Sequence, residues 1–275
     1  MDTSLSPDFS DSLRPEEVLP LLRTSWLGRP YYYREKVSST NDLALQLGSQ
    51  GAPHGTVVLG EEQLAGRGRL SRPWISLPGC GVYLSMILRD PMPHQDAPKA
   101  TMVAALSLVR VLQKCHRLPA SIKWPNDVLI HKNKVAGILT EMRAEEDAIR
   151  FLVIGVGINV NHTAFLEKPS FRCPATSIAI ELERTIRRSD LLVAFLEAFE
   201  SDYGRFRSQG FDSLLPELER ACSTLGQSVQ IESVREMISG RAVGLTAAGA
   251  LRLILKDGSE RVVWAGDVTQ VGLGN

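Results

Sequence analysis

The sequence predicts an α/β fold: a mixed sheet with flanking helices, followed by a small antiparallel β domain. From Tyr31 onward, strand-like and helix-like stretches alternate, and after Gly226 the chain changes to short segments separated by Gly or Asp-Gly turns. Alternation alone would also allow a doubly wound parallel sheet. A hairpin expected over residues 129–139 indicates antiparallel pairing and favours the mixed sheet.

These patterns divide the 275 residues into three parts. Residues 1–30 contain many Ser, Asp and Pro residues around a short amphipathic piece at 18–27, which predicts a tail with a helix or a loose arm. We expect the main domain over residues 31–224 and the small β domain over residues 225–275. No internal repeat is visible.

The first elements of the main domain follow from capping and periodicity. We expect a helix in SSTNDLALQLGSQG, residues 38–51, because Ser39 or Thr40 can accept hydrogen bonds from the first turn and Gly48 or Gly51 can end it. TVVLGEEQ (56–63) and VYLSMIL (82–88) read as strands, the second one buried. Small and aliphatic residues at helical spacing predict a long helix over residues 100–116.

The later elements complete the order. Residues 121–143 predict a strand, a turn at 125–127 and a hairpin near 132–134, followed by the apolar strand FLVIGVGINV, 151–160. That strand, near Val153, is a candidate sheet edge at which two copies of the chain could pair. Helices are expected at 188–209 and 211–222, and the segments from 227 to 266 predict a small antiparallel barrel.

Composition narrows the function classes. The 31 basic residues balance the 31 acidic ones, so broad binding to nucleic acid is not expected, and any anion site must be local. The four cysteines form no CxxC pair, which argues against a zinc ribbon and a disulfide scaffold. The acidic start does not resemble a secretory signal, and no segment approaches the ~20 apolar residues of a membrane span. We expect a cytoplasmic protein that binds neither DNA nor membrane.

The segment EEQLAGRGRLSRPW, residues 61–74, is the most unusual stretch and is called the arginine loop below. Arg67, Arg69 and Arg72 place three guanidinium groups beside Gly66 and Gly68, an arrangement that suits phosphate oxygens. A solvated flexible basic loop is the alternative. Trp74, at its end, could stack on a base or belong to the core.

Two further segments hold polar groups at turns. IKWPNDVLI places Lys123, Asn126 and Asp127 around a turn, although a plain Pro-Asn-Asp turn would also explain the amide and the carboxylate. SSTN at 38–41 offers hydroxyls and an amide at a helix start, where ordinary N-capping is the alternative.

Glycines also stand within apolar strands, at Gly137, Gly155 and Gly157. Glycine in a strand often marks the close approach of a ligand, and a tight packing crossover is the alternative.

Taken in order, these motifs resemble one family. SSTN, Q-x-A-G-R-G-R-x-x-R-x-W, KWPND, K-x-A-G-I-L-x-E and G-x-G-I-N-V-N, closed by a small β domain, resemble the biotin protein ligases over about residues 36–270. The resemblance implies a class II synthetase-like mixed sheet and a C-terminal SH3-like β-barrel. Some members carry an N-terminal helix-turn-helix domain, for which residues 1–30 are too short, so the resemblance implies the form without it.

The resemblance also implies the reaction. Biotin would attack the α-phosphate of ATP to give biotinyl-5′-AMP and pyrophosphate, and a lysine of a biotin carboxyl-carrier domain of a biotin-dependent carboxylase would then attack the mixed anhydride. ATP and biotin would be the small-molecule substrates, with Mg²⁺ arriving on the nucleotide and no dedicated metal site.

The same resemblance assigns the site residues. Lys123, Arg67, Arg69 and Asp127 would be catalytic, with Asp127 helping to deprotonate the acceptor lysine. The biotin-binding residues would be Ser39, Thr40, Asn41, Gln63, Gly66, Arg67, Gly68, Arg69, Lys134, Gly137, Gly155 and Gly157. The ATP-binding residues would be Arg67, Arg69, Trp74, Lys123, Asn126 and Asn159.

Ser71 departs from the family pattern, which often has Gly there, and this predicts a less flexible arginine loop. Two alternatives stay open: a lipoate or octanoate transfer enzyme of the related fold, and a non-catalytic biotin-sensing regulator.

Overall fold

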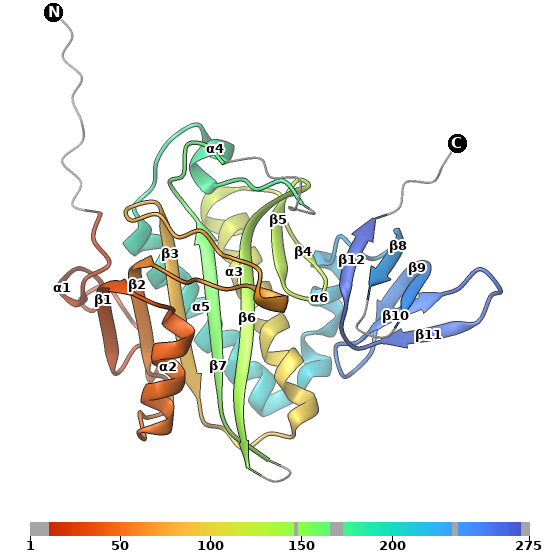
Figure 1. Cartoon of the computed structure of the whole chain (residues 1–275), viewed down its shortest axis with the longest axis horizontal. Coiled ribbons are helices and arrows are strands. Elements are labelled where there is room, and N and C mark those ends of the chain that lie inside the picture. Colours follow the sequence, from red (N-terminus) through yellow and green to blue (C-terminus); the bar gives the residue numbers. More distant parts are fainter. Residues whose placement is uncertain (1–10, 146–147, 166–172, 233–235, 271–275) are drawn as a thin grey trace, which may run out of the picture.

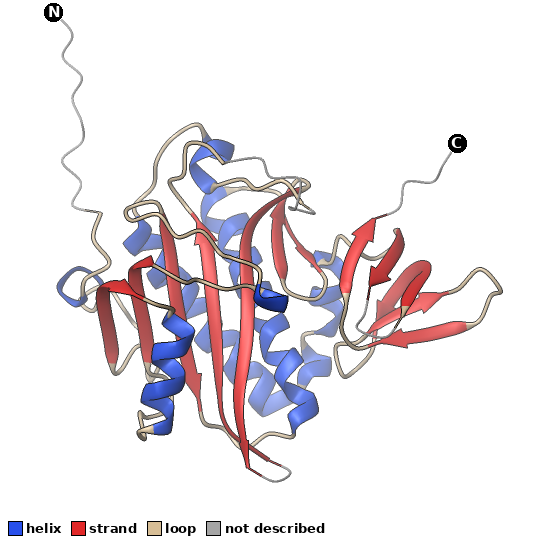
Figure 2. Cartoon of the chain, viewed as in Figure 1, coloured by secondary structure: helices blue, strands red, loops and turns tan. Residues whose placement is uncertain are grey.

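The main domain is built on a seven-stranded mixed sheet (Figures 1 and 2). The computed structural model describes residues 11–145, 148–165, 173–232 and 236–270. The strand order is β1-β2-β3-β7-β6-β5-β4; β1 and β2 are parallel and the other pairs are antiparallel. This confirms the mixed sheet that the sequence predicts. The strands are β1 (Tyr31–Val37), β2 (Val57–Gln63), β3 (Gly81–Leu88), β4 (Ala120–Lys123), β5 (Asp127–Ile130), β6 (Asn133–Glu145) and β7 (Ala148–Asn159).

Helices cover the two faces of this sheet unequally. The long helices α3 (Ala97–His116) and α5 (Arg188–Gln209), with α6 (Leu215–Ala221), pack on one face and form the main core (Figure 1). On the other face α2 (Thr40–Ser49) covers a small apolar cluster. The short helix α4 (Ile178–Leu182) follows β7 and buries Ile178 in the main core. The rest of that second face, beyond α2, carries the site. Within the described part of the chain, no helix is long and apolar enough to cross a membrane.

The described part of the N-terminal segment is not a loose arm. Its helix is short, α1 (Pro15–Val18), and irregular chain follows up to Pro30. Leu13, Val18 and Leu27 are nonetheless fully buried in the main core. The amphipathic spacing at residues 18–27 therefore reflects packing of an irregular chain against the domain, not a helix.

The edge expected at Val153 is wrong. Val153 lies on β7, which is paired with β3 on one side and β6 on the other. A run of apolar residues is typical of a strand in the interior of a sheet, and this accounts for the sequence FLVIGVGINV. Pairing of two copies through β7 is therefore excluded.

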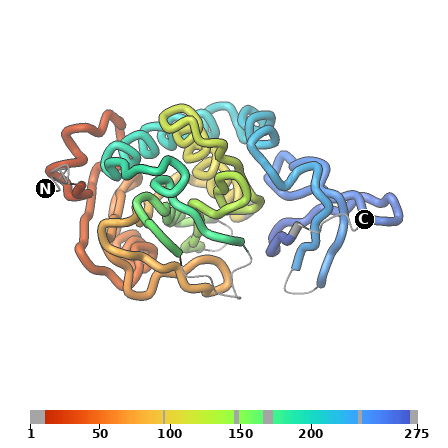
Figure 3. Tube along the Cα trace, turned by 90° about the horizontal axis from the view of Figure 1, so that it is seen from above, coloured from red at the N-terminus to blue at the C-terminus, as the bar shows by residue number. Residues whose placement is uncertain are grey.

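The C-terminal β domain is a five-stranded antiparallel sheet in the order β11-β10-β9-β8-β12, seen as a separate lobe in Figure 3. Its strands are β8 (Ser228–Glu232), β9 (Met237–Leu245), β10 (Leu251–Ile254), β11 (Glu260–Val263) and β12 (Asp267–Gln270). The short alternating segments predicted four of these strands. The fifth, β12, pairs with β8 and brings Asp267 to the side facing the main domain.

Candidate functional site

Three strand glycines form the floor of the site. Gly137 on β6 faces Gly157 on β7, and Gly155 lies two residues before Gly157 on the same strand. A Cβ on Gly155 would lie 2.1 Å from Asn41 Oδ1, and one on Gly157 would lie 2.5 Å from Trp74 Cε2. The three glycines, called the glycine trough below, thus let two large side chains lie directly on the sheet backbone.

The start of α2 supplies hydrogen-bonding groups at one end of the trough. Ser39 caps the helix and accepts from the Asp42 amide, so the capping alternative holds for this residue. The Thr40 amide and hydroxyl donate to Gln63 Oε1 at 2.9 and 3.1 Å, and Gln63 Nε2 donates to Ser76 Oγ at 3.0 Å. The SSTN segment and the end of β2 therefore form one polar group.

Asn41 extends this polar group across the sheet. Its Nδ2 donates to Glu141 Oε2 at 2.6 Å and to the Leu139 carbonyl at 3.2 Å, and its Oδ1 accepts from the Ser85 hydroxyl at 2.6 Å. Asn41 is only 4% exposed. A buried, connected set of donors and acceptors keeps a fixed geometry, which suits recognition of a small polar ring.

The arginine loop is anchored at both ends of its cationic stretch. The Arg67 guanidinium donates to both carboxylate oxygens of Asp42 on α2, and this pairing raises the pKa of Arg67. Arg72 pairs with Asp267 on β12. Arg69 donates to Asn126 Oδ1 at 3.1 Å and to the Gly266 carbonyl at 3.2 Å. The alternative of a solvated basic loop does not describe this arrangement.

Burial lowers the pKa of Arg69, while the nearby Asp267 carboxylate opposes that shift. Arginine titrates so far above neutrality that Arg69 stays charged at pH 7. A guanidinium held in a partly buried position has few waters to screen it, so its field acts on whatever anion enters beside it.

The KWPND turn is fixed from two sides. Trp124 is 2% exposed; its backbone N–H donates to Thr224 Oγ1 and its indole N–H to the Gly249 carbonyl, both at 3.0 Å. Asn126 Nδ2 donates to the Ile138 carbonyl at 2.9 Å. The β domain thus supports the turn through Gly249, a contact that the sequence does not indicate.

Charged groups gather beyond the turn. Lys134 Nζ lies 2.6 Å from Asp127 Oδ1 and 5.4 Å from the centre of the Trp74 ring. Lys123 is opposite Asp127 in the β4–β5 register. Cys173 is close enough that both lysines affect it, although burial dominates and raises the pKa of its thiol. The structure therefore brings Lys123, Asp127 and Lys134 together.

Trp74 lies on the trough, and Asn159 adjoins the backbone of Lys134. Asn159 is 5% exposed, and its Nδ2 donates to the Thr176 carbonyl at 3.0 Å and, at 3.5 Å, to that of Lys134. The Trp74 ring covers Gly157 and lies 3.1 Å from the place of a Cβ on Gly137. Its buried indole N–H has no hydrogen-bond partner among the described residues.

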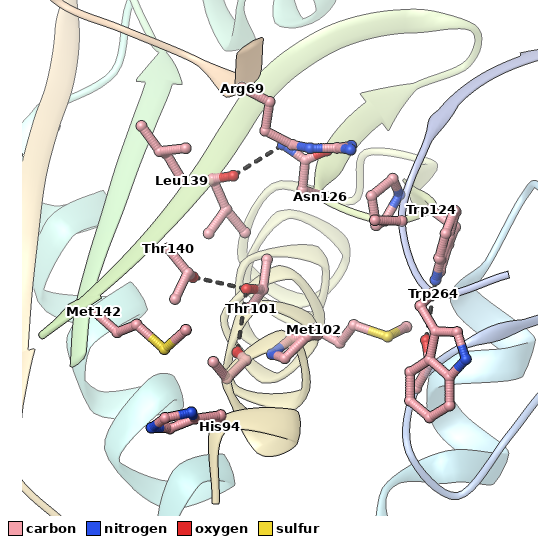
Figure 4. A pocket seen from close by; sticks show the side chains of 16 residues that line it. Arg69, His94, Thr101, Met102, Trp124, Asn126, Leu139, Thr140, Met142 and Trp264 are labelled. Atoms are coloured by element: carbon pink, nitrogen blue, oxygen red, sulfur yellow. Dashed lines mark hydrogen bonds between the residues drawn. The ribbon is translucent and has the colours of Figure 1, made fainter. Parts of the chain in front are cut away.

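A cavity of about 310 Å³ opens next to the KWPND turn, between the main domain and the β domain (Figure 4). Arg69 and Asn126 stand at one end of it, and Met102, Met142 and Trp264 line the apolar remainder. Two threonine hydroxyls on its wall, from Thr101 and Thr140, bond to each other at 2.7 Å. The cavity therefore shares Arg69 and Asn126 with the polar site, while most of its remaining wall is apolar.

Sequence reasoning did not assign several groups of the site: Asp42, Ser76, Ser85, Glu141, Cys173, Gly266 and Asp267. Two of them had a signal, because Asp42 directly follows SSTN and Glu141 ends K-x-A-G-I-L-x-E. Asp267 had none, since it stands 195 residues after its partner Arg72.

The carboxylates near the site are already matched to other groups. Asp42, Asp127 and Asp267 each face a guanidinium or an ammonium, and Glu141 faces the Asn41 amide. These carboxylates therefore bind arginine and lysine side chains of the protein. A metal ion at the site would need further oxygen ligands from a bound substrate.

Comparison with known proteins gives a consistent result. The chain matches the model of the Biotin/lipoate A/B protein ligase family over residues 33–159 and that of the Biotin protein ligase C terminal domain over residues 224–269.

Individual proteins agree with these matches. The chain is 35% identical over 250 residues to the bifunctional ligase/repressor BirA of Bacillus spizizenii, and the alignment covers 91% of this chain and 77% of that protein. It is 29% identical over 272 residues to the biotin–[acetyl-CoA-carboxylase] ligase of Mycobacterium tuberculosis, covering 95% and 98%. The biotin protein ligase from Aquifex aeolicus, solved in complex with biotin and ATP, superposes with a TM-score of 0.73 at 27% identity, covering 86% of this chain and 96% of that one.

Proposed function

Because the chain belongs to the biotin/lipoate A/B protein ligase family, and within it to the biotin protein ligases, we propose that it attaches biotin to a lysine of a carrier domain in two steps. The biotin carboxylate attacks the α-phosphorus of ATP, pyrophosphate leaves, and biotinyl-5′-AMP forms. The lysine amine then attacks the acyl carbon and AMP leaves. The match to the Biotin protein ligase C terminal domain favours this function over lipoate or octanoate transfer.

The observation that carries the proposal is the convergence of five separated motifs on one face of the sheet. The start of α2, the arginine loop, the KWPND turn, Lys134 and the glycine trough all meet there. Adenylate formation needs two anions to be brought together, and this face combines a polar end, a flat floor and a cationic end.

Biotin would lie along the glycine trough. Its ureido group needs both donors and acceptors, which Ser39, Thr40, Asn41 and Gln63 offer at the α2 end. Gly137, Gly155 and Gly157 would admit the flat bicyclic ring, and Gly66 and Gly68 would let the arginine loop approach it. Trp74 now lies over Gly157, so its side chain would have to shift for the ring to reach the sheet there.

The anionic groups would meet at the opposite end. Lys134 would orient the biotin carboxylate, and Arg67, Arg69 and Lys123 would stabilise charge that develops on the α-phosphate. Trp74 would stack on adenine, with Asn126 and Asn159 nearby. ATP would enter as its magnesium complex, since the carboxylates of the site are matched to protein cations, and the metal would neutralise phosphate charge.

Asp127 would act in the second step. A lysine amine with an ordinary pKa near ~10.4 is mostly protonated at pH 7 and cannot attack. Asp127 is paired with Lys134 at 2.6 Å, so its carboxylate becomes available when Lys134 turns to the substrate anion. Asp127 could then accept the proton of the incoming amine.

The test is incubation of the protein with biotin, MgATP and a biotin carboxyl-carrier domain, followed by mass spectrometry of the carrier. The expected product carries one biotin on one lysine. Biotin-dependent exchange of pyrophosphate into ATP reports the first step separately. A carrier without added mass, together with no exchange, would refute the function, and modification by lipoate under the same conditions would favour the related transfer reaction.

Asp127→Asn tests the proposed base. Transfer from preformed biotinyl-AMP should fall by about 10²-fold or more near pH 7, because loss of a general base typically costs 10²–10⁴-fold. Raising the pH should recover part of the rate as the amine deprotonates without help. A variant with normal transfer rates across the pH range would show that Asp127 has another role.

Partner and location follow from the same proposal. The carrier would belong to a biotin-dependent carboxylase, as the name of the Mycobacterium tuberculosis relative indicates for that enzyme. The free thiols Cys80, Cys115, Cys173 and Cys222 favour the reducing cytoplasm. Independence from DNA rests on the zero net charge, and a homodimer stays a prediction whose interface is not β7.

A further inference from the structure

We infer that Asp267 and the Gly266 carbonyl of the C-terminal β domain are positioning groups that hold the arginine loop over the site. Together with Arg69 and Arg72 they are called the domain clasp below. The effect of the clasp on the reaction rests on the proposed function. The contacts of the clasp are present in the protein without substrates and do not depend on that function.

The arginine loop has internal structure but needs outside support. The Gly68 amide donates to the Arg72 carbonyl at 2.8 Å, and the Trp74 amide donates to that of Gly66 at 2.8 Å. These bonds close the loop into a small hairpin. They do not determine whether the hairpin lies against the sheet or swings away from it.

Two carboxylates, one from each domain, hold the arginine loop in its position. On the main domain, Asp42 of α2 binds Arg67 with both oxygens. On the β domain, Asp267 pairs with Arg72 and lies 3.8 Å from the Arg69 guanidinium. The side chain of Asp267 is only 10% exposed, so its pairing with two arginines is weakly screened and stronger than an ordinary surface ion pair.

The acceptors on the β domain stand at the start of a paired strand. A Cβ on Gly266 would lie 2.3 Å from Ile231 Cγ2, so the chain passes close to β8 here. Asp267 begins β12, which is paired with β8 along its length. The clasp therefore transmits the position of the whole β domain to Arg69.

Arg69 connects the clasp to the chemistry. One guanidinium nitrogen reaches both Asn126 Oδ1 and the Gly266 carbonyl, so Arg69 joins the KWPND turn to the β domain. Trp264 and Ala265, directly before Gly266, line the cavity at the domain interface. If the β domain moves away from the main domain, the arginine loop loses its contacts with Gly266 and Asp267. The cavity then also loses the part of its wall that Trp264 and Ala265 form. Closure of the site is thus coupled to docking of the β domain.

The first test uses the free protein and needs no activity. Trypsin can cleave after Arg67 and Arg69, and the clasp should protect these bonds. Asp267→Asn keeps the shape and removes the charge, so cleavage in the loop should accelerate about tenfold, the effect expected for loss of a bond to a charged group. Glu260→Gln is the matched control, because it makes the same change at the exposed Arg252–Glu260 pair of the same domain. Equal cleavage of the wild type and Asp267→Asn would overturn the clasp.

The second test measures retention of biotinyl-AMP formed from biotin and MgATP. Asp267→Asn should release it about tenfold faster, and Arg72→Gln added to Asp267→Asn should change the rate little, because the Arg72–Asp267 pair is already broken. Independent, multiplicative effects of the two single changes would contradict the inference. A wild type that forms no adenylate would instead refute the proposed function, and leave the proteolysis result to decide the clasp.

Discussion

Gly157→Ala is the sharpest test of the glycine trough. The added methyl group would lie 2.5 Å from Trp74 Cε2 and 2.7 Å from Trp74 Nε1, where ordinary contact begins at about 3.4 Å. The indole must therefore retreat by roughly 0.9 Å, and the methyl group then stands on the floor where biotin would lie. The fold should survive, because Trp74 is carried by a loop that can adjust.

Gly157→Ala should weaken the binding of biotin. Overfilling a packed site costs about 1–3 kcal/mol, which corresponds to a roughly 5- to 150-fold rise in the Kd for biotin. Titration calorimetry with biotin measures this, and urea unfolding should show a change in the free energy of unfolding of less than about 1 kcal/mol.

Gly204→Ala is the matched control. Gly204 lies in α5 with nothing within 4 Å of the added carbon, so the same chemical change should stabilise the helix by about 0.5–1 kcal/mol and leave biotin binding alone. The trough would be refuted as the biotin floor if Gly157→Ala bound biotin as tightly as Gly204→Ala.

Two further predictions concern buried side chains outside the trough. Trp124→Phe removes the indole bond to the Gly249 carbonyl and leaves a buried acceptor unpaired, so the free energy of unfolding should fall by about 1–3 kcal/mol in urea titrations; a loss below about 0.5 kcal/mol would show that the β domain does not support the turn. His162, 4% exposed, has its pKa lowered by burial from 6.5 to about 4. As the pH falls, His162 takes up a proton in the unfolded chain before it does so in the folded protein. The free energy of unfolding should therefore be unaffected by His162 above pH 6.5 and should fall by roughly 3 kcal/mol as the pH drops towards 4. His162→Phe should flatten this part of the stability profile, and an unchanged profile would assign the loss to other groups.

Much of the fold follows from local patterns. The helix expected over residues 100–116 is α3, which begins only three residues earlier, because helical spacing of small and aliphatic residues is a strong signal. Ser39 caps α2 as expected, since the free amides of a first turn need a nearby oxygen. The segments of the candidate site were each ambiguous alone, and their order along the chain, which resembles that of the biotin protein ligases, assigned the site residues.

What the sequence could not predict depends on contacts between distant segments. Val153 reads as apolar whether its strand is at the edge of the sheet or inside it, and only the pairing with β3 and β6 decides. Residues 18–27 have helical spacing, yet packing against the main core keeps them irregular. The partners of Arg67 and Arg72 are likewise chosen by tertiary structure, because any carboxylate of the chain could have served.

The backbone of the arginine loop has a consequence for how the site opens. Leu70 and Ser71 both adopt left-handed conformations, with φ of 53° and 55°, which cost a non-glycine residue about 1–2 kcal/mol each. The free chain at these residues would relax to a different shape, so the resting loop is held in place by its partners and not by its own preference. Loss of those partners would therefore favour opening of the loop. A glycine at position 71 would remove part of this bias and let the open and closed shapes exchange with less dependence on the β domain.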